Sequence, residues 1–146
     1  MDNMRLADNQ KIFFIYNPIA LTDVVLDGLT ITGALGVNYG GAIDGFTSSV
    51  SIQGSTIAGN VVYAGYGGGA IYTGAALSVE DSAFFGNVAI DGTNATVGHG
   101  GGAIFSNGGY LSARNTTFAE NQALNGTGGS AAAARTPCAA MATTTR

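Results

Sequence analysis

The sequence predicts an all-β protein, a right-handed parallel β-helix of about four to five rungs of roughly 27 residues each. Three observations support this fold: a recurring Gly-Gly-Ala-Ile tetrapeptide, a recurring turn that ends in Asn, and alternating apolar and polar residues between them. A unit this short cannot bury its apolar face alone, so successive units must stack to form a continuous core.

The Gly-Gly-Ala-Ile tetrapeptide begins at Gly40, Gly68 and Gly101, so its starts are 28 and then 33 residues apart. Glycine supplies the positive φ values that tight turns need, and 24 of the 146 residues are glycine. The tetrapeptides are therefore expected at tight turns of the coil. A partial earlier rung is expected in residues 12–16, which are apolar or aromatic.

Three segments between the motifs alternate apolar and polar residues, which is typical of a strand with one buried face. These segments are 50–53, 77–80 and 111–114, and residues 24–27 align with them in an earlier copy of the repeat. The expected inward ladder contains Val50, Leu77 and Leu111, and the expected outward row contains Ser51, Ser78 and Ser112. Glu80 and Arg114 fall in one outer column of neighbouring rungs, where an exposed ion pair contributes at most about 1 kcal/mol.

A second motif follows each tetrapeptide and ends in an asparagine, and these asparagines are 27 and then 34 residues apart. They are Asn60, Asn87 and Asn121, and the residues three positions earlier are Ile57, Phe84 and Phe118. We expect the asparagines at one corner of each rung, because Asn tolerates the left-handed conformation and its amide can bond to the equivalent amide one rung away. The three earlier residues are expected to form a second inward ladder with stacked phenyl rings.

The regular repeats span residues 6–129, whereas residues 130–146 have low complexity and no alternation. This tail is predicted to be disordered or weakly helical. The connection 91–98 is the one insertion into the repeat, and such insertions often carry the function of a repeat protein. Solenoids need polar caps and neither end provides one, so we expect the chain to be part of a longer protein with further rungs.

The charge balance excludes several kinds of partner. The net charge is −4 and the five basic residues are scattered, so no basic stripe exists for nucleic acid or an anionic membrane. No apolar run reaches the ~18 residues that a membrane-spanning helix needs. His99 is the only histidine and Cys138 the only cysteine, which excludes a metal site of Cys and His, and no cofactor is expected.

The pairing of Gly-Gly-Ala-Ile with Phe-x-x-Asn resembles the repeats of the polymorphic outer membrane proteins. The resemblance covers residues 6–129, with Ile57 in place of the Phe in the first copy. It implies a right-handed parallel β-helix in a cell-surface or secreted segment like an autotransporter passenger, often with an adhesive role. The implied location is extracellular, or at the cell outer membrane in a bacterium.

Pectin-degrading enzymes share the β-helix fold, so a catalytic site has to be argued from its own residues. The tripeptide at 98–100, which contains His99, resembles a short motif of polygalacturonases, but those enzymes also use clustered aspartates. Asp81 and Asp91 are the nearest carboxylates in sequence, and Glu80 would point away from Asp81 on a regular strand. An inverting glycosidase needs two carboxylates about 6.5–9.5 Å apart. The sequence therefore favours a protein that is not an enzyme.

The favoured function is a non-catalytic scaffold for adhesion or binding, with a surface glycan or a protein of unknown identity as partner. Its candidate contact residues lie in the outer serine row and in the insertion: Ser51, Ser78, Ser112, Asp91, Thr93 and Asn94. The alternative is a fragment of a pectinase-like enzyme that acts on polysaccharides, in which Asp81, Asp91 and His99 are the residues to test. Ice or mineral binding ranks last, because its Thr-x-Thr pattern occurs only once in the repeat region 6–129, at 30–32.

Overall fold

The protein folds as a parallel β-helix of about four to five rungs, in agreement with the fold that the sequence predicts. The computed structural model describes residues 11–16, 23–90, 101–107, 109–124 and 140–141. Within these residues every regular element is a β-strand. The insertion at 91–98 and most of the tail at 130–146 lie outside the described residues.

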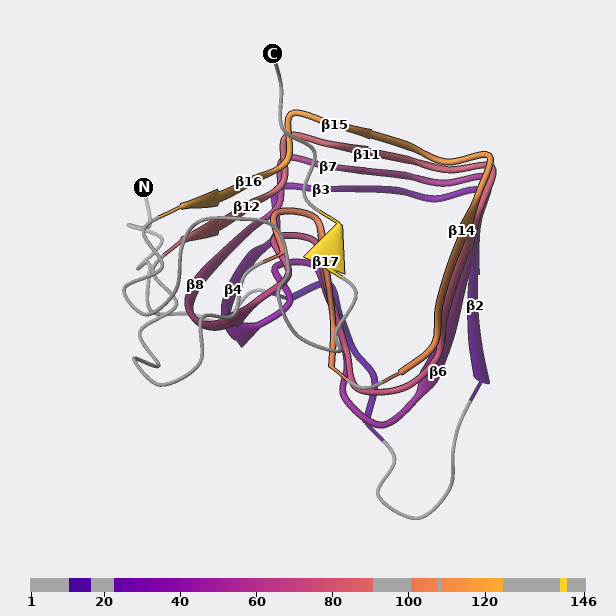
Figure 1. The fold of residues 1–146 in the computed structure, drawn as a ribbon, viewed down its shortest axis with the longest axis horizontal. Helices are drawn as coiled ribbons and strands as arrows, with labels where there is room; N and C mark the ends of the chain where they lie inside the picture. Colours follow the sequence, from indigo (N-terminus) through magenta and orange to yellow (C-terminus); the bar gives the residue numbers. More distant parts are fainter. Residues whose placement is uncertain (1–10, 17–22, 91–100, 108, 125–139, 142–146) are drawn as a thin grey trace, which may run out of the picture.

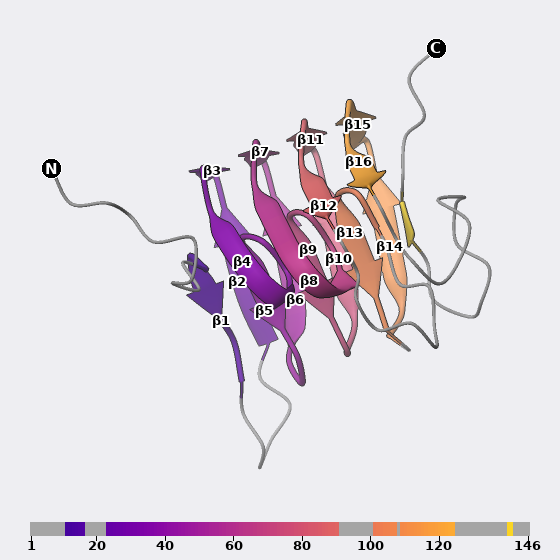
Figure 2. The same cartoon turned by 90° about the vertical axis from the view of Figure 1, so that its left-hand side faces the viewer.

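Four stacks of strands form the walls of the coil (Figures 1 and 2). The first sheet contains β1 (Phe13–Phe14), β5 (Ile43–Gly45), β9 (Ile71–Thr73) and β13 (Ile104–Ser106). The second contains β2 (Asp23–Asp27), β6 (Ser49–Gln53), β10 (Leu77–Glu80) and β14 (Leu111–Arg114). The third contains β3 (Thr30–Thr32), β7 (Thr56–Ala58), β11 (Ala83–Phe85) and β15 (Thr117–Ala119). The fourth contains β4 (Leu35–Tyr39), β8 (Val61–Gly67), β12 (Val88–Ile90) and β16 (Gln122–Leu124).

The coil is right-handed. In Figure 1 the chain runs anticlockwise through β14, β15 and β16, and the earlier rungs follow the same path. Figure 2 places the later rungs on the side that faces the viewer in Figure 1. An anticlockwise path that approaches the viewer is a right-handed helix, which is the normal hand of a crossover between parallel strands.

The register of the sheets follows the alignment of the repeats. Leu77 is paired with Val50 on one side and with Leu111 on the other. In the third sheet Phe84 lies between Ile57 and Phe118, and the two phenyl rings stack with centroids 5.0 Å apart. Buried apolar side chains from successive rungs form one cluster inside the coil, and Leu111 and Phe118 of the last described rung pack against it. Stacking of rungs therefore provides the core that a single unit lacks.

The tetrapeptide requires glycine for two different reasons. Its first residue has a positive φ, which is 48° at Gly40 and 80° at Gly68. Its second residue lies against the backbone of the next rung: a Cβ atom on Gly41 would lie 2.0 Å from the carbonyl oxygen of Gly69, and one on Gly69 would lie 2.1 Å from that of Gly102. No side chain fits in these positions, which explains the repeated Gly-Gly pair.

Two corners of each rung contain one residue in the left-handed conformation. Between the second and third sheets the corner residues are Gly28, Gly54, Asp81 and Asn115, with φ between 46° and 65°. Between the third and fourth sheets they are Gly33, Gly59, Gly86 and Glu120, with φ between 56° and 72°. The expectation that Asn60, Asn87 and Asn121 adopt this conformation is wrong, because the residue before each of them makes the turn.

The tail contributes one short strand that the sequence did not predict. β17 (Ala140–Met141) pairs antiparallel with β13, so that Ile104 lies opposite Met141 and Phe105 opposite Ala140. This pairing covers the outer edge of the first sheet. It involves two residues of the segment for which a disordered or helical structure was expected.

Candidate functional site

The asparagine column is a continuous hydrogen-bonded ladder inside the coil. Asn60, Asn87 and Asn121 are at most 2% exposed. The Asn87 side chain accepts from the backbone N–H of Asn60 (3.1 Å) and donates to the carbonyl oxygen of Ile57 (2.9 Å). The same amide also accepts from the Asn60 side chain at 3.0 Å and donates to the Asn121 side chain at 2.8 Å. The ladder thus satisfies buried main-chain groups at the corner, which is a structural role.

A second ladder at the other corner was missed by the sequence analysis. Ser55 Oγ accepts from the backbone N–H of Leu29 at 3.1 Å, and Ser82 Oγ accepts from that of Ser55 at 3.1 Å. Each hydroxyl donates to the carbonyl oxygen two residues earlier, and Thr116 does the same in the next rung. The available signal was a hydroxyl residue five positions before each Asn of the ladder.

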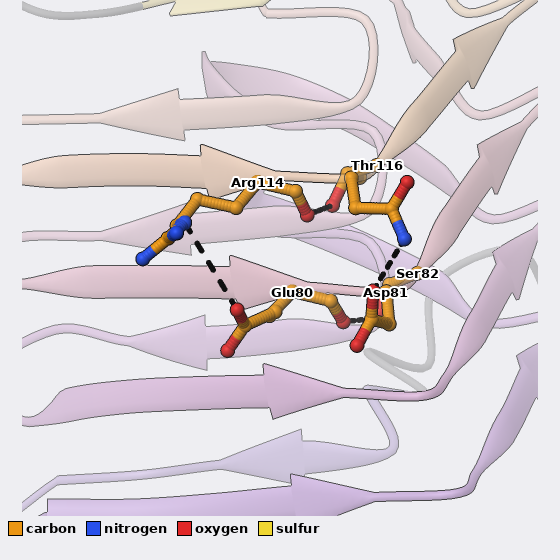
Figure 3. Close-up of polar contacts among 6 residues, drawn as sticks. Glu80, Asp81, Ser82, Arg114 and Thr116 are labelled. Atoms are coloured by element: carbon orange, nitrogen blue, oxygen red, sulfur yellow. Dashed lines mark hydrogen bonds and ion pairs between the residues drawn. The ribbon is translucent and has the colours of Figure 1, made fainter.

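The predicted serine row lies on the outer face of the second sheet. Ser51 and Ser78 are exposed and Ser112 is partly exposed, and the three are paired across β6, β10 and β14. In the same sheet the guanidinium of Arg114 approaches Glu80 at 4.0 Å, with side chains 78% and 46% exposed (Figure 3). Such an exposed pair contributes little to stability.

Two of the three carboxylates weighed for catalysis, Glu80 and Asp81, already have partners. Asp81 occupies the left-handed corner, where its carboxylate accepts a hydrogen bond from Asn115 (Figure 3). Glu80 is the last residue of β10, the strand before this corner, and its side chain faces Arg114 of β14. A turn therefore separates these neighbours. Asp91, Thr93, Asn94 and His99, which the sequence analysis also singled out, lie outside the described residues.

A cluster of aromatic rings is the most distinctive surface feature of the described residues, and the sequence analysis did not find it. It lies on the first sheet, on the ends of β4 and β8, and on the residues that follow β1 and β5. Its members, called the aromatic cluster below, are Phe14, Tyr16, Tyr39, Phe46, Tyr66, Tyr72 and Phe105. The usable signal was an aromatic residue next to the tetrapeptides, as at Tyr39 and Tyr72.

The aromatic cluster has a buried base and an exposed rim. Tyr72 and Phe105 are at most 3% exposed, and their rings stack with centroids 5.7 Å apart and planes 16° apart. Above this base, Phe14 is 66%, Tyr16 51% and Phe46 42% exposed. Ring contacts connect the rim, since Tyr16 lies 6.0 Å from Phe14 and 6.4 Å from Phe46 between centroids. The rim rings are therefore held on the rigid stack of strands.

A buried ion pair supports the aromatic cluster from one side. Asp44 takes the place in the first sheet that Phe14, Tyr72 and Phe105 take in the other rungs. Its Oδ2 atom lies 2.6 Å from Nζ of Lys11, and the two side chains are 2% and 7% exposed. Lys11 Nζ also lies 5.7 Å from the ring centroid of Phe14, within cation–π range.

Burial raises the pKa values of Tyr39, in the aromatic cluster, and of Asp44 beside it. Desolvation raises the pKa of Asp44, and the hydrogen bond and charge of Lys11 oppose this rise. Its second oxygen, Oδ1, is buried without a hydrogen-bond partner among the described residues. Burial, and then the neighbouring Tyr66, raise the pKa of Tyr39 above 10.0. Tyr39 is therefore neutral at physiological pH, and the charge of Asp44 is matched by Lys11.

Other kinds of site find no support within the residues that the structure describes. No group of three or more His, Cys, Asp or Glu side chains is placed to hold a metal ion there. In the same residues no helix has the length and apolar character that crossing a membrane requires. Comparison of the chain with protein-family models, curated proteins and solved structures finds no match.

Proposed function

We propose that this protein is a non-catalytic binding scaffold whose contact surface is the rim of the aromatic cluster. The observation that carries the proposal is the row of three exposed rings in which Tyr16 contacts both Phe14 and Phe46, above the buried stack of Tyr72 and Phe105. Clustered exposed aromatic surface usually marks a binding site, because leaving it in water is unfavourable. The serine row and the insertion at 91–98 remain further candidates for contact.

The chemistry of the rim favours an uncharged glycan as the partner. The apolar faces of sugar rings stack on aromatic rings, and the hydroxyl groups at their edges remain hydrated. The net charge of −4 disfavours polyanions, and Lys11, whose Nζ lies 5.7 Å from the centre of the Phe14 ring, is already paired with Asp44. A protein surface rich in apolar side chains is the competing partner.

The resemblance to polymorphic outer membrane proteins supports a place for this scaffold outside the cell. In that family the repeats occur in surface or secreted segments, and an adhesive role would suit a long rigid coil with aromatic contacts. We therefore propose an extracellular or cell-surface location and an adhesive use.

A binding screen with matched variants tests the proposal. The 146-residue chain is applied to an array of neutral and acidic glycans, beside a variant with Phe14→Ala, Tyr16→Ala and Phe46→Ala. Tyr110→Ala is the matched control, because Tyr110 is 77% exposed and makes no ring contact among the described residues. We expect neutral glycans to bind the parent chain and the control equally, and the triple variant at least about ten-fold more weakly.

Two results would count against this function. Equal binding by the triple variant would move the contact surface elsewhere, and a Ser51→Ala, Ser78→Ala, Ser112→Ala variant would then test the serine row. Turnover of polygalacturonate that is lost in Asp81→Asn, but retained in Tyr110→Ala, would favour the enzyme alternative.

A further inference from the structure

Two tyrosines from neighbouring rungs form a close parallel ring stack. Tyr39 is the last residue of β4, and Tyr66 lies one residue before the end of β8. Their ring centroids lie 4.8 Å apart and the ring planes are 6° apart. The two side chains also share a hydrogen bond, which must join the two hydroxyl groups because a tyrosine side chain has no other polar group. The ring carbons next to the two hydroxyl groups therefore lie against one another.

The backbone of β8 leaves its regular pairing at Tyr66. Asn38 is paired with Gly65 and Tyr39 with Gly67, with a register shift between the two pairs. Tyr66 is therefore an extra residue of β8, inserted between these pairs. An extra residue of this kind is a β-bulge, and bulges commonly redirect a side chain. Here the bulge brings Tyr66 beside the ring of Tyr39.

A strained backbone accompanies the bulge. Asn38 has a φ of 73°, a left-handed conformation that is uncommon in residues other than glycine. On the neighbouring strand, a Cβ atom on Gly65 would collide with the backbone of Asn38. Such strain persists only where the surroundings enforce it, and it gathers at functional positions. The strained segment leads directly into the tyrosine pair, which makes this pair a candidate for a functional position.

A third tyrosine ring contacts the pair at a different angle. The ring plane of Tyr72 is 63° from that of Tyr39 and 61° from that of Tyr66. Tyr72 is only 2% exposed, and its hydroxyl group accepts a hydrogen bond from Nδ2 of Asn107 at 3.1 Å. Tyr39 and Tyr66 are both partly exposed. A reagent in solution therefore reaches the stacked pair but not Tyr72.

We propose that Tyr39 and Tyr66 form an oxidative cross-linking site, at which a peroxidase and hydrogen peroxide join the two rings as dityrosine. Each phenol loses one electron to the peroxidase and its hydroxyl proton to water, which leaves a phenoxyl radical whose unpaired spin lies partly on the ring carbons next to the oxygen. The two radicals couple through one such carbon each, so that a C–C bond forms. The hydrogen on each coupled carbon then leaves as a proton while the phenolic oxygen takes one up, which restores both hydroxyl groups. The pair loses two hydrogen atoms in total, and one molecule of hydrogen peroxide takes them up to give two molecules of water.

Contact between the rings favours coupling within one molecule. Two reactants held against one another combine far faster than the same groups on separate molecules. The rings need only turn out of their parallel stack to join at their edges, and their partial exposure permits this turn. The bond would connect two neighbouring rungs through residues 39 and 66. This chemistry does not depend on the binding function proposed above.

The test treats the full 146-residue chain in dilute solution with a peroxidase and hydrogen peroxide, and measures the mass of the monomer. We expect the monomer to lose the mass of two hydrogen atoms and to gain dityrosine fluorescence, with the cross-link between residues 39 and 66 located by mass spectrometry of a digest. Tyr66→Phe keeps the ring but lacks the hydroxyl group that the oxidation needs, so this variant should form at least about ten-fold less cross-linked monomer. Tyr39→Phe is a second variant with the same expected loss.

Tyr110→Phe is the matched control, because Tyr110 is 77% exposed and makes no ring contact among the described residues. Its monomer should cross-link like that of the parent chain. Urea unfolding gives a second readout. Since the bond restricts the unfolded chain between residues 39 and 66, the treated parent chain should unfold at a higher urea concentration than the untreated chain, whereas treatment of Tyr66→Phe should bring no such shift.

Three results would overturn the inference. The first is a monomer of unchanged mass after a treatment that cross-links free N-acetyltyrosine in the same tube. The second is an equal yield of cross-linked monomer in Tyr66→Phe or Tyr39→Phe. The third is a cross-link that joins other tyrosines of the monomer, or that forms between molecules alone.

Discussion

Replacement of Asn87 by alanine should be the most damaging single change in the asparagine ladder. Asn87 makes four side-chain hydrogen bonds, to the backbone of Ile57 and Asn60 and to the side chains of Asn60 and Asn121. It is fully buried, so no solvent replaces these partners. Asn60 and Asn121, which each have a ladder neighbour on one side only among the described residues, make three side-chain bonds.

The size of the stability loss follows from the buried groups that lose their hydrogen-bond partner in Asn87→Ala. The N–H of Asn60 and the carbonyl oxygen of Ile57 both lose the side-chain partner that reaches them inside the coil. A buried polar group left unpaired costs about 1–3 kcal/mol, and the missing carboxamide leaves a small cavity. We therefore expect a loss of about 3–5 kcal/mol in the free energy of unfolding, against a total of about 5–15 kcal/mol for a typical domain.

Urea unfolding followed by far-UV circular dichroism measures this loss by linear extrapolation. Gln122→Ala is the control, since Gln122 is an exposed amide side chain, and its effect should stay within about 0.5 kcal/mol. A loss below about 1 kcal/mol for Asn87→Ala, or one equal to that of Gln122→Ala, would refute the assigned role of the ladder.

The same urea titration checks three further predictions. Gly69→Ala should lower the free energy of unfolding by at least about 3 kcal/mol, because its Cβ atom would lie 2.1 Å from a carbonyl oxygen. Gly59→Ala should lower it by about 1 kcal/mol, because a Cβ atom there meets open space and only the positive φ is unfavourable. Equal losses would contradict the packing argument. Glu120→Gly should stabilise the protein by about 0.5–1 kcal/mol, because Glu120 holds a φ of 57° where the other three rungs have glycine, and Glu120→Ala should bring no gain. Burial raises the folded-state pKa of Asp44 above its ordinary value of 3.8. The stability that this raised pKa contributes is therefore complete below pH 3.8 and is lost as the pH rises through the folded-state pKa. Stability of Asp44→Asn relative to the parent chain should therefore increase from pH 3.5 to pH 7, and a decrease would show that the ion pair with Lys11 dominates.

The register of the coil could be predicted from the sequence because each ladder repeats one residue type at one position. Val50, Leu77 and Leu111 show this directly, and the asparagine column shows it for a polar group. The direction of the asparagine ladder could not be predicted, since it depends on which rung each carboxamide reaches. The left-handed turn residue was misplaced by one position because both Gly59 and Asn60 suit such a turn.

The aromatic cluster was harder to predict because only three of its members, Phe14, Tyr72 and Phe105, repeat at one position. Tyr39 and Tyr66 come from the ends of β4 and β8, and Phe46 follows β5. Asp44 interrupts the aromatic column of the first sheet, and its partner Lys11 is 33 residues away in sequence. A ring contact between such positions follows from the path of the backbone, which periodicity alone does not describe.

The corner between the fourth and first sheets allows the chain to gain residues without disturbing the coil. The next Gly-Gly pair begins at the sixth residue after Ala34, at the eighth after Asn60 and at the fourteenth after Asn87. The strands on both sides nevertheless keep their pairing, with Ile90 opposite Tyr63 and Ile104 opposite Ile71. Since doubling a loop costs only about 0.6 kcal/mol, foreign peptides grafted at this corner should be displayed beside Tyr39 and Tyr66 at little expense in stability. The same tolerance would let related coils diversify what they recognise while their frame stays constant.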